Sequence, residues 1–366
     1  VDGCSGPVPA CTVTVEGPTG RLSLPPGDTL TYTMTLNTQY LPVGEFEYLV
    51  ETGPRIHYLS AERDVLAFED TSGAGGLLAM GDPAFDEPSL FAVLAPEGNP
   101  VKLDEAYRVA SAATYRGLRS SCAGFASMHF EPLPATGVEV DEVVGLWNRQ
   151  PKAHTTSGVA SSEAIGLRGA SASEAAFKSL ASGTRMIHLA THGFFLGEGC
   201  PSAIDGARSP AIGGVARAVA GENPLLLSGF ALAGANHRDA AGPDEEDGIL
   251  TAEEIASLNM TNVEWAVLSG CDTGVGEVRV GEGVFGLRRA FQVAGARTLI
   301  MSLWPVEDET TRKWMKALYD NRFAKGMSTI DAVHEANLEV LRQRREAGLS
   351  THPAYWAGFI ASGDWR

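Results

Sequence analysis

Two residues able to do nucleophilic chemistry each stand at the end of an apolar run. "MIHLATHGFF" carries His192 directly after such a run, and "EWAVLSGCDTG" carries Cys271 in the same way. A thiolate is a strong nucleophile, and a neighbouring imidazolium lowers the pKa of a thiol and can protonate a leaving amine. A glycine follows His192 and another precedes Cys271, so a substrate carbonyl could approach backbone N–H groups closely, as an oxyanion hole requires. The pattern predicts a cysteine–histidine dyad.

Each of these residues also has a structural interpretation. A histidine in an apolar run is more often a packed core or surface residue, and a cysteine at a strand end is usually a small buried hydrophobe. Cys122 and Cys200 do not follow an apolar run, whereas Cys271 does. His188 lies inside its apolar run rather than at the end, which favours a structural role.

The segments around these residues alternate between strand and helix patterns. Strands are predicted at residues 76–80, 186–190, 264–269, 297–304 and 354–361. Helices are predicted at residues 104–118, 138–147, 284–294, 309–323 and 328–345. This alternation predicts an α/β fold with a mainly parallel sheet and helices on both faces. Chemistry in such sheets lies outside the carboxyl ends of the strands, so His192 and Cys271 would share a crevice if their strands were neighbours.

Two further helix starts carry the pattern of a capping box. Ser171 with Glu174, and Thr251 with Glu254, place a hydroxyl three residues before a carboxylate. Such a pair satisfies two free backbone N–H groups reciprocally. We therefore expect Ser171 and Thr251 to be N-cap residues.

The chain divides into a short β-rich extension and one large domain. Residues 1–40 contain "LTYTMTL", whose strict alternation predicts an amphipathic strand in a hairpin-like extension. The main domain is expected over 41–366. Within it, residues 196–248 are expected to form a long loop region framing the active site, because segments of this length between elements are usually functional or disordered.

Composition excludes several classes of partner. The chain has 366 residues and a net charge of −17, which argues against binding a nucleic-acid backbone. No apolar run approaches the roughly 20 residues of a membrane helix, and no membrane partner is expected. The five cysteines are few, odd in number and scattered, which indicates a reducing compartment and a cytoplasmic location.

Several blocks in order resemble the CHAT family of caspase-like proteins, which is grouped with caspases, metacaspases, separases and gingipains. The blocks are "EYLVETGPRIHYLSAERDVL", "LLAMGDPAF", "LPAT", "HLATHGFF", "DGILTAEEI", "LSGCDTGVG", "GEGVFGLRRAFQVAGA", "SLWPVED" and "YWAGFIASGD". The resemblance implies a caspase-like fold, with His192 as catalytic histidine and Cys271 as nucleophile. The backbone N–H groups of Gly193 and Cys271 would form the oxyanion hole, and a protein would be the substrate.

The resemblance also implies a preference at the substrate residue before the scissile bond, P1. In separases the last aspartate of an "LWxVxD" stretch binds a basic P1 side chain. "LWPVED" places Asp308 in that position, with Glu307 beside it and Ser302 just upstream. Metacaspase-like members instead have an acid two residues before the cysteine, where this chain has Ser269. Cleavage after Arg or Lys is expected; Asp308 as a helix N-cap and an uncharged P1 residue are the alternatives.

No cofactor and no metal are expected. "GEGVFG" matches a dinucleotide-binding pattern but stands a dozen residues after its strand, and "DEEDG" lacks the spacing of a calcium loop and is interpreted as a solvated acidic segment. Family members commonly carry helical-repeat sensors upstream and act in bacterial defence or regulated cell death, including cleavage of gasdermin-type proteins. An activating partner or upstream module is thus expected. Self-cleavage at Arg208, Arg217 or Arg238 is a further hypothesis, and a non-catalytic scaffold is the alternative function.

Overall fold

The computed structural model describes a central sheet and the helices that cover it. The residues described are 13–17, 20–24, 51, 55, 57, 75–88, 125, 128–150, 163–196, 223–242, 245–270, 282–304 and 306–364. The predicted strand "LTYTMTL" and the predicted helix at 104–118 lie outside them. Within residues 1–40 the structure describes an antiparallel pair, β1 (Val13–Gly17) and β2 (Gly20–Leu24).

Six strands form the central sheet in the order β11-β10-β9-β5-β3-β4. Their bounds are Leu77–Pro83 for β3, Ala164–Gly169 for β4, Met186–Ala190 for β5, Trp265–Leu268 for β9, Thr298–Ser302 for β10 and Phe359–Gly363 for β11. All neighbours are parallel except β10 and β11. The mainly parallel sheet predicted from the alternating pattern is confirmed.

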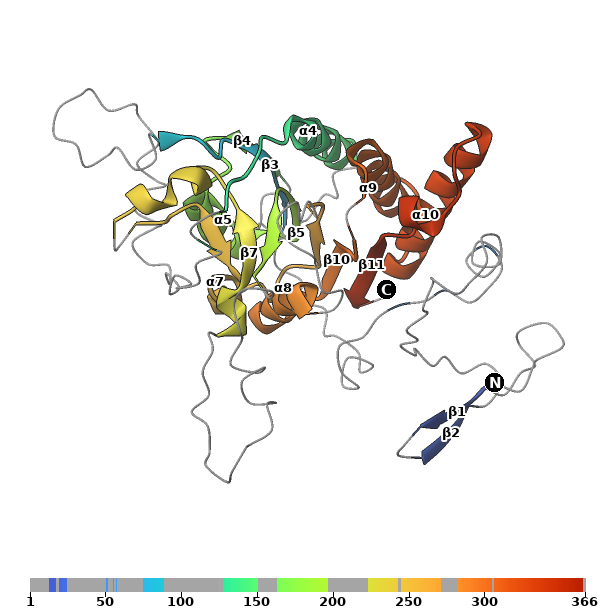
Figure 1. Ribbon diagram of the computed structural model, residues 1–366. Helices are drawn as coiled ribbons and strands as arrows, with labels where there is room; N and C mark the ends of the chain where they lie inside the picture. The colour runs from blue at the N-terminus through green and yellow to red at the C-terminus, as the bar shows by residue number, and fades with distance from the viewer. Residues whose placement is uncertain are drawn as a thin grey trace, which may run out of the picture.

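Helices cover both faces of this sheet (Figure 1). One apolar cluster joins the sheet to α4 (Pro134–Asn148), α9 (Asp308–Phe323) and α10 (Thr329–Glu346). The other joins it to α5 (Glu174–Leu180), α7 (Ala252–Ser257) and α8 (Glu282–Ala294). Because both faces are covered, the central strands β3, β5 and β9 are buried along almost their whole length, which explains their continuous apolar runs.

A second, three-stranded antiparallel sheet occupies part of the segment expected to be a loop region. Its strands are β6 (Gly193–Phe195), β7 (Ser228–Ala231) and β8 (Ile249–Thr251). The 3₁₀ helices η7 (Pro224–Leu226) and η8 (Ala235–Ala240) flank β7. Within the expected loop region 196–248, residues 228–231 are therefore a strand, because β7 pairs with both β6 and β8.

Three further predictions about element ends are corrected. The N-cap of α5 is Ser173, whose hydroxyl accepts from the Ala176 N–H, and Ser171 instead bonds the Arg168 carbonyl. The carboxylate of Glu174 is turned away from this cap toward other partners, so no capping box forms there. The last strand begins only at Phe359, because η9 (Pro353–Tyr355) precedes it.

The capping box at Thr251 and Glu254 is confirmed. The Thr251 hydroxyl accepts from the Glu254 N–H, and the Glu254 carboxylate accepts from the Thr251 N–H. The helices expected at 284–294, 309–323 and 328–345 are also present, with ends that shift by one or two residues.

Candidate active site

The strands that lead to His192 and Cys271 are neighbours in the sheet. β5 and β9 are parallel and in register, with Leu189 opposite Leu268, and the Ser269 N–H donates to the Leu189 carbonyl at 2.8 Å. Beyond the strands the two chains stay in contact, since a Cβ built on Gly270 would lie 1.4 Å from the Thr191 carbonyl oxygen. The residues after both strands therefore lie at one rim of the sheet.

His192 is buried at this rim between two aromatic rings. His192 is 7% exposed, and the ring centroids of Phe85 and Phe130 lie 5.4 Å and 5.8 Å from its imidazole. Its Nε2 lies 2.8 Å from the Glu131 carbonyl oxygen. A carbonyl can only accept, so Nε2 carries the proton, and in the neutral ring Nδ1 is then the acceptor nitrogen.

The backbone on either side of His192 is held by β7. The Ala231 N–H donates to the His192 carbonyl at 2.9 Å, and the Thr191 hydroxyl donates to the Ala231 carbonyl at 2.6 Å. Antiparallel ladder bonds alternate along a strand. His192 and Ala231 face each other as a hydrogen-bonded pair of the ladder. The next pair, Gly193 and Phe230, is therefore a pair whose backbone groups are not hydrogen-bonded to each other. The Gly193 N–H therefore points away from β7 and takes no part in its ladder.

Gly193 also lies close to the end of β9. A Cβ built on Gly193 would lie 3.4 Å from the Gly270 carbonyl oxygen and 3.6 Å from the Phe230 ring. The two glycines that flank the predicted dyad are thus near neighbours. Cys271 itself lies outside the described residues, so its predicted role and its N–H in the oxyanion hole stay predictions.

A pocket of about 160 Å³ opens beside Gly270 at the same rim. Its lining contains both polar and apolar residues and comprises Leu133, Thr136, Thr191, Ser269, Gly270, Ser302, Val306, Asp308, Thr311 and Phe359. Two of the three predicted P1-binding residues, Asp308 and Ser302, line it. Glu307 does not, and its carboxylate accepts from the Thr310 hydroxyl at 3.2 Å.

The polar groups of the pocket differ in whether other protein atoms use them. Ser302 bonds the Trp304 carbonyl, and Thr136 bonds the Leu133 carbonyl at 2.7 Å. The Ser269 hydroxyl is buried and has no hydrogen-bond partner among the described residues. Asp308 is exposed and is the first residue of α9, whose N-cap is Glu307, so the alternative of Asp308 as the N-cap is wrong.

Several residues of the rim were missed by the sequence analysis. The Glu131 carbonyl and the rings of Phe85 and Phe130 contact His192 from segments distant in the chain. Thr136 and Thr311 come from α4 and α9. The "LPAT" block was a usable signal for the α4 part, because Pro134 at a helix start marks where that helix enters the rim.

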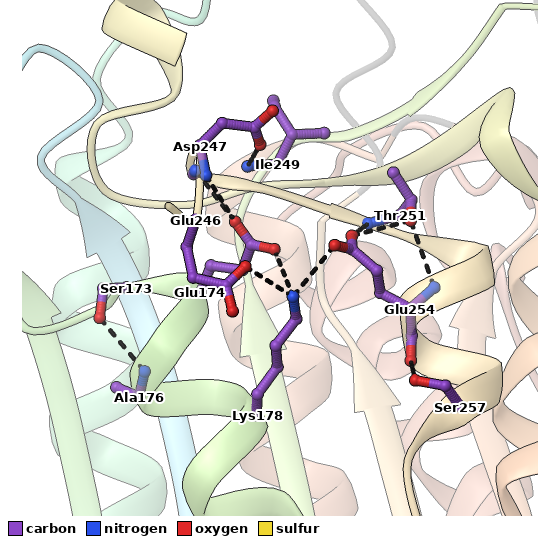
Figure 2. A network of polar contacts seen from close by, with 11 residues as sticks. Ser173, Glu174, Ala176, Lys178, Glu246, Asp247, Ile249, Thr251, Glu254 and Ser257 are labelled. Carbon is purple, nitrogen blue, oxygen red and sulfur yellow. Dashed lines mark hydrogen bonds and ion pairs between the residues drawn. The ribbon is translucent and has the colours of Figure 1, made fainter. Parts of the chain in front are cut away.

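A second polar cluster lies around Lys178, on α5. Its ammonium bonds three carboxylates, those of Glu174 at 2.8 Å, Glu246 at 2.7 Å and Glu254 at 3.0 Å. Figure 2 shows the ammonium lying between these carboxylates, with Glu174 also reaching the backbone near Asp247. The side chain of Lys178 has no exposed surface. The interpretation of "DEEDG" as a solvated segment is therefore wrong for Glu246 and Asp247.

Burial shapes the protonation of this cluster. Burial, followed by the nearby charge of Glu254, raises the pKa of Glu174 well above its ordinary value. Burial alone would lower the pKa of Lys178, but the adjacent carboxylates of Glu174, Glu254 and Glu246 hold it above its ordinary value. The oxygens of the three glutamates lie within 4.8 Å of one another, a spacing that suits a cation, and here the lysine ammonium occupies that role.

Arg238 and His188 are both buried and engaged. The Arg238 side chain bonds three backbone carbonyls, and the residue is 4% exposed, so Arg238 cannot enter an active site from this conformation and is not a self-cleavage site in it. Arg208 and Arg217 lie outside the described residues. His188 is fully buried between Glu139 and Tyr319, each 3.0 Å from one ring nitrogen, as the structural role predicted for it requires.

Comparisons with known proteins match nearly the whole chain to one family. The CHAT domain family matches residues 18–364. Tetratricopeptide repeat protein 28 of Homo sapiens is 31% identical over 121 residues, and the same protein of Mus musculus is 30% identical over 121 residues. Each match covers 33% of this chain and 5% of the relative, so the chain spans a small part of those proteins. In the described parts of the chain, no helix combines the length and apolar character needed to cross a membrane.

Proposed function

We propose that this chain, which belongs to the caspase-like CHAT domain family, is a cysteine endopeptidase that uses Cys271 and His192. The observation that carries the proposal is the contact of Gly270 with Thr191 at the end of two neighbouring parallel strands. Cys271 is the residue after Gly270, and His192 is the residue after Thr191. Because consecutive Cα atoms are about 3.8 Å apart, each dyad residue is one residue from this contact. The structural alternative for each residue does not account for the contact of the residues directly before them, Gly270 and Thr191, at one rim.

The proposed reaction is acyl transfer to sulfur. The proton of the Cys271 thiol passes to Nδ1 of His192, which becomes an imidazolium. The Cys271 thiolate then attacks the scissile carbonyl carbon, forming a C–S bond, while the carbonyl oxygen becomes an oxyanion bonded by the N–H groups of Gly193 and Cys271. His192 then gives a proton to the leaving amine as the C–N bond breaks. Water attacks the thioester, its proton passes to His192, and the thiolate is restored. The Glu131 carbonyl holds Nε2, which leaves Nδ1 to carry the transferred proton.

We propose that the pocket beside Gly270 receives a basic P1 side chain. Asp308 is the one acidic side chain in the described lining, and the Ser269 hydroxyl is a second acceptor there. A guanidinium presents five N–H donors in a rigid fork, whereas an ammonium is a compact charge that makes fewer directed bonds. A carboxylate and a free hydroxyl in one pocket therefore favour Arg over Lys.

The test combines covalent labelling with a cleavage profile. A peptidyl electrophile with Arg at P1 should label the wild-type chain at Cys271 and should not label Cys271→Ala. A peptide library should be cut after Arg by the wild type alone. An intact library together with an unlabelled Cys271 would support the non-catalytic scaffold instead.

The biological setting is proposed from the family. We propose a cytoplasmic protein substrate, such as a gasdermin-type protein, in bacterial defence or regulated cell death, with activity controlled by a partner or upstream module. The relatives bear the name of a tetratricopeptide repeat protein, which fits control by helical repeats. Residues 1–40 are proposed as an extension to the peptidase domain at 41–366. Incubating a gasdermin-type protein with wild type and Cys271→Ala tests the substrate, and uncut protein in both reactions would contradict it.

A further inference from the structure

We infer that Asn236 and Arg238, on η8, are positioning residues that set the orientation of the His192 imidazole. The inference rests on the proposed role of His192, but its contacts are independent of Cys271. Both residues bond described residues among Phe125 and 128–131, and residues 130 and 131 supply the carbonyl and one of the rings that contact the His192 imidazole.

Asn236 pairs with this segment in the way a neighbouring strand would. Its Oδ1 accepts from the Phe130 N–H at 2.9 Å, and its Nδ2 donates to the Phe130 carbonyl at 2.9 Å. The same Nδ2 donates to the Asp86 carboxylate at 2.9 Å. One amide thus satisfies both backbone groups of Phe130, which fixes the position of the peptide that leads directly to the Glu131 carbonyl.

Arg238 fixes the other end of the segment. Its guanidinium donates to the carbonyls of Phe125 and Met128, each at 2.8 Å, and to the Ala235 carbonyl of its own helix at 2.9 Å. The guanidinium carbon also lies 5.3 Å from the centre of the Phe125 ring. A planar fork that bonds carbonyls in two segments holds them at a set separation, which a flexible ammonium would not do.

The same turn also holds the second ring that packs on His192. The Gly234 N–H donates to the Ala84 carbonyl and the Asn236 N–H donates to the Phe85 carbonyl, each at 3.0 Å. Phe85 and Phe130 come from two segments that are distant in the sequence. Both segments are bonded to residues 234–238. The carbonyl acceptor and both flanking rings depend on this one turn.

This arrangement assigns the turn a role in catalysis beyond stability. His192 must present Nδ1 toward the scissile bond, and that requires an acceptor kept opposite Nε2. When residues 128–131 shift, the Nε2 proton loses its acceptor, the ring adopts both neutral tautomers, and the proton needed by the leaving amine is misplaced. Misplacement of about 1 Å in a catalytic group lowers rates by about 100-fold.

The experiment reads the tautomer of His192 directly. The chain is labelled with ¹⁵N-histidine, its eight histidines are compared with those of His192→Gln to assign the signal, and spectra are recorded at alkaline pH. We expect a single Nε2–H tautomer in wild type, and a mixture in Asn236→Ala and in Arg238→Gln. Asn223→Ala and Arg168→Gln, which remove exposed side-chain bonds to Glu253 and Asp141, are the matched controls and should keep the wild-type spectrum.

Kinetics provide the second readout. In Asn236→Ala the kcat for an Arg peptide should fall about 10- to 100-fold, with KM changed less than about twofold, because the pocket is untouched. Asn236→Asp, which keeps the side-chain volume but puts oxygen against the Phe130 carbonyl, should act similarly. It replaces Asn236→Ala if that variant unfolds.

The outcomes separate the two proposals. A folded Asn236 variant with the wild-type tautomer and the wild-type kcat overturns the positioning role. An equal loss in the two control variants also overturns it, because the effect would then be general. Absence of peptidase activity in wild type contradicts the proposed function, while the tautomer of His192 still decides whether Asn236 and Arg238 orient the ring.

Discussion

The rim around His192 and the cluster around Lys178 are two buried polar regions built in opposite ways. At Lys178 every charge meets another within about 3 Å, and the backbone near Gly248 is bonded as well. At the rim, His192 is bonded to a neutral carbonyl, Ser269 and Asp308 line a pocket, and the Ser269 hydroxyl has no hydrogen-bond partner among the described residues. Polar groups that bond one another stabilise the fold. Polar groups that line a pocket without such bonds are suited to bind a substrate.

The sharpest test of this contrast is the removal of the imidazole. His192→Gln should reduce kcat/KM at least about 1000-fold, because the leaving amine loses its proton donor. The thermal midpoint should stay near that of wild type, since the ring bonds a neutral backbone carbonyl and packs on aromatic rings rather than compensating a buried charge. His352→Gln, an exposed control, should retain activity; a strongly destabilised His192→Gln would show that the rim is structural.

The opposite result is expected at the second region. Lys178→Met removes the ammonium from three carboxylates, two of them buried and that of Glu246 half-buried, and should lower the free energy of unfolding by about 3–5 kcal/mol. Urea unfolding measures this change. The control Lys316→Met breaks the exposed pair with Asp320 and should change it by less than about 1 kcal/mol. Equal effects in both variants would contradict a compensated buried cluster.

The pocket carboxylate should set substrate preference rather than stability. Asp308→Asn should lower kcat/KM for Arg peptides about 100-fold, because a charge-assisted bond to the guanidinium becomes a neutral one. Competing peptides that differ only at P1 measure this. Glu307→Gln is the matched control, since Glu307 is adjacent in sequence but outside the pocket lining, and an effect there as large as at Asp308 would reassign the P1 contact.

The pH dependence of stability distinguishes the regions by its sign. The folded chain raises the pKa of Glu174 above its ordinary 4.5, so above that pH the folded state holds more protons than the unfolded state. Stability contributed through this group therefore falls as pH rises. From roughly pH 5 to 8 the free energy of unfolding should decline more steeply in wild type than in Glu174→Gln, which cannot titrate.

Glu309, on the surface, provides a control for the pH dependence of the free energy of unfolding. A hydrogen bond from Arg312 lowers the pKa of Glu309, so its contribution is present at neutral pH and is lost as pH falls. Glu309→Gln should therefore remove a small slope of the opposite sign. Parallel curves for wild type and Glu174→Gln would show that burial does not hold a proton on Glu174.

The smallest expected effect is at the free hydroxyl. Ser269→Ala should reduce the preference for Arg over Lys about fivefold, the consequence of losing one hydrogen bond of about 1 kcal/mol. The ratio of kcat/KM for two peptides that differ only in Arg and Lys measures it. Ser302→Ala is the control, because the Ser302 hydroxyl already bonds the Trp304 carbonyl. In this variant the ratio of kcat/KM for the Arg and Lys peptides should be unchanged.

The sequence by itself determined the features that arise from local patterns. Continuous apolar runs specified buried parallel strands, and a titratable residue just beyond such a run pointed to the rim at His192. The Thr251–Glu254 capping box needed only a three-residue spacing. In each case neighbouring residues carry the whole physical cause, so the pattern is visible without the fold.

Tertiary structure alone decided which polar residues are buried and what they bond. Glu246 and Asp247 look solvated in sequence, and only the packing of α5 against the turn before β8 brings Lys178 to them. Asn236 reaches Phe130 across 106 positions, and the acceptor for His192 is a backbone carbonyl that any residue at 131 would supply. Contacts between distant segments, and contacts made through the backbone, leave no trace in residue type or spacing.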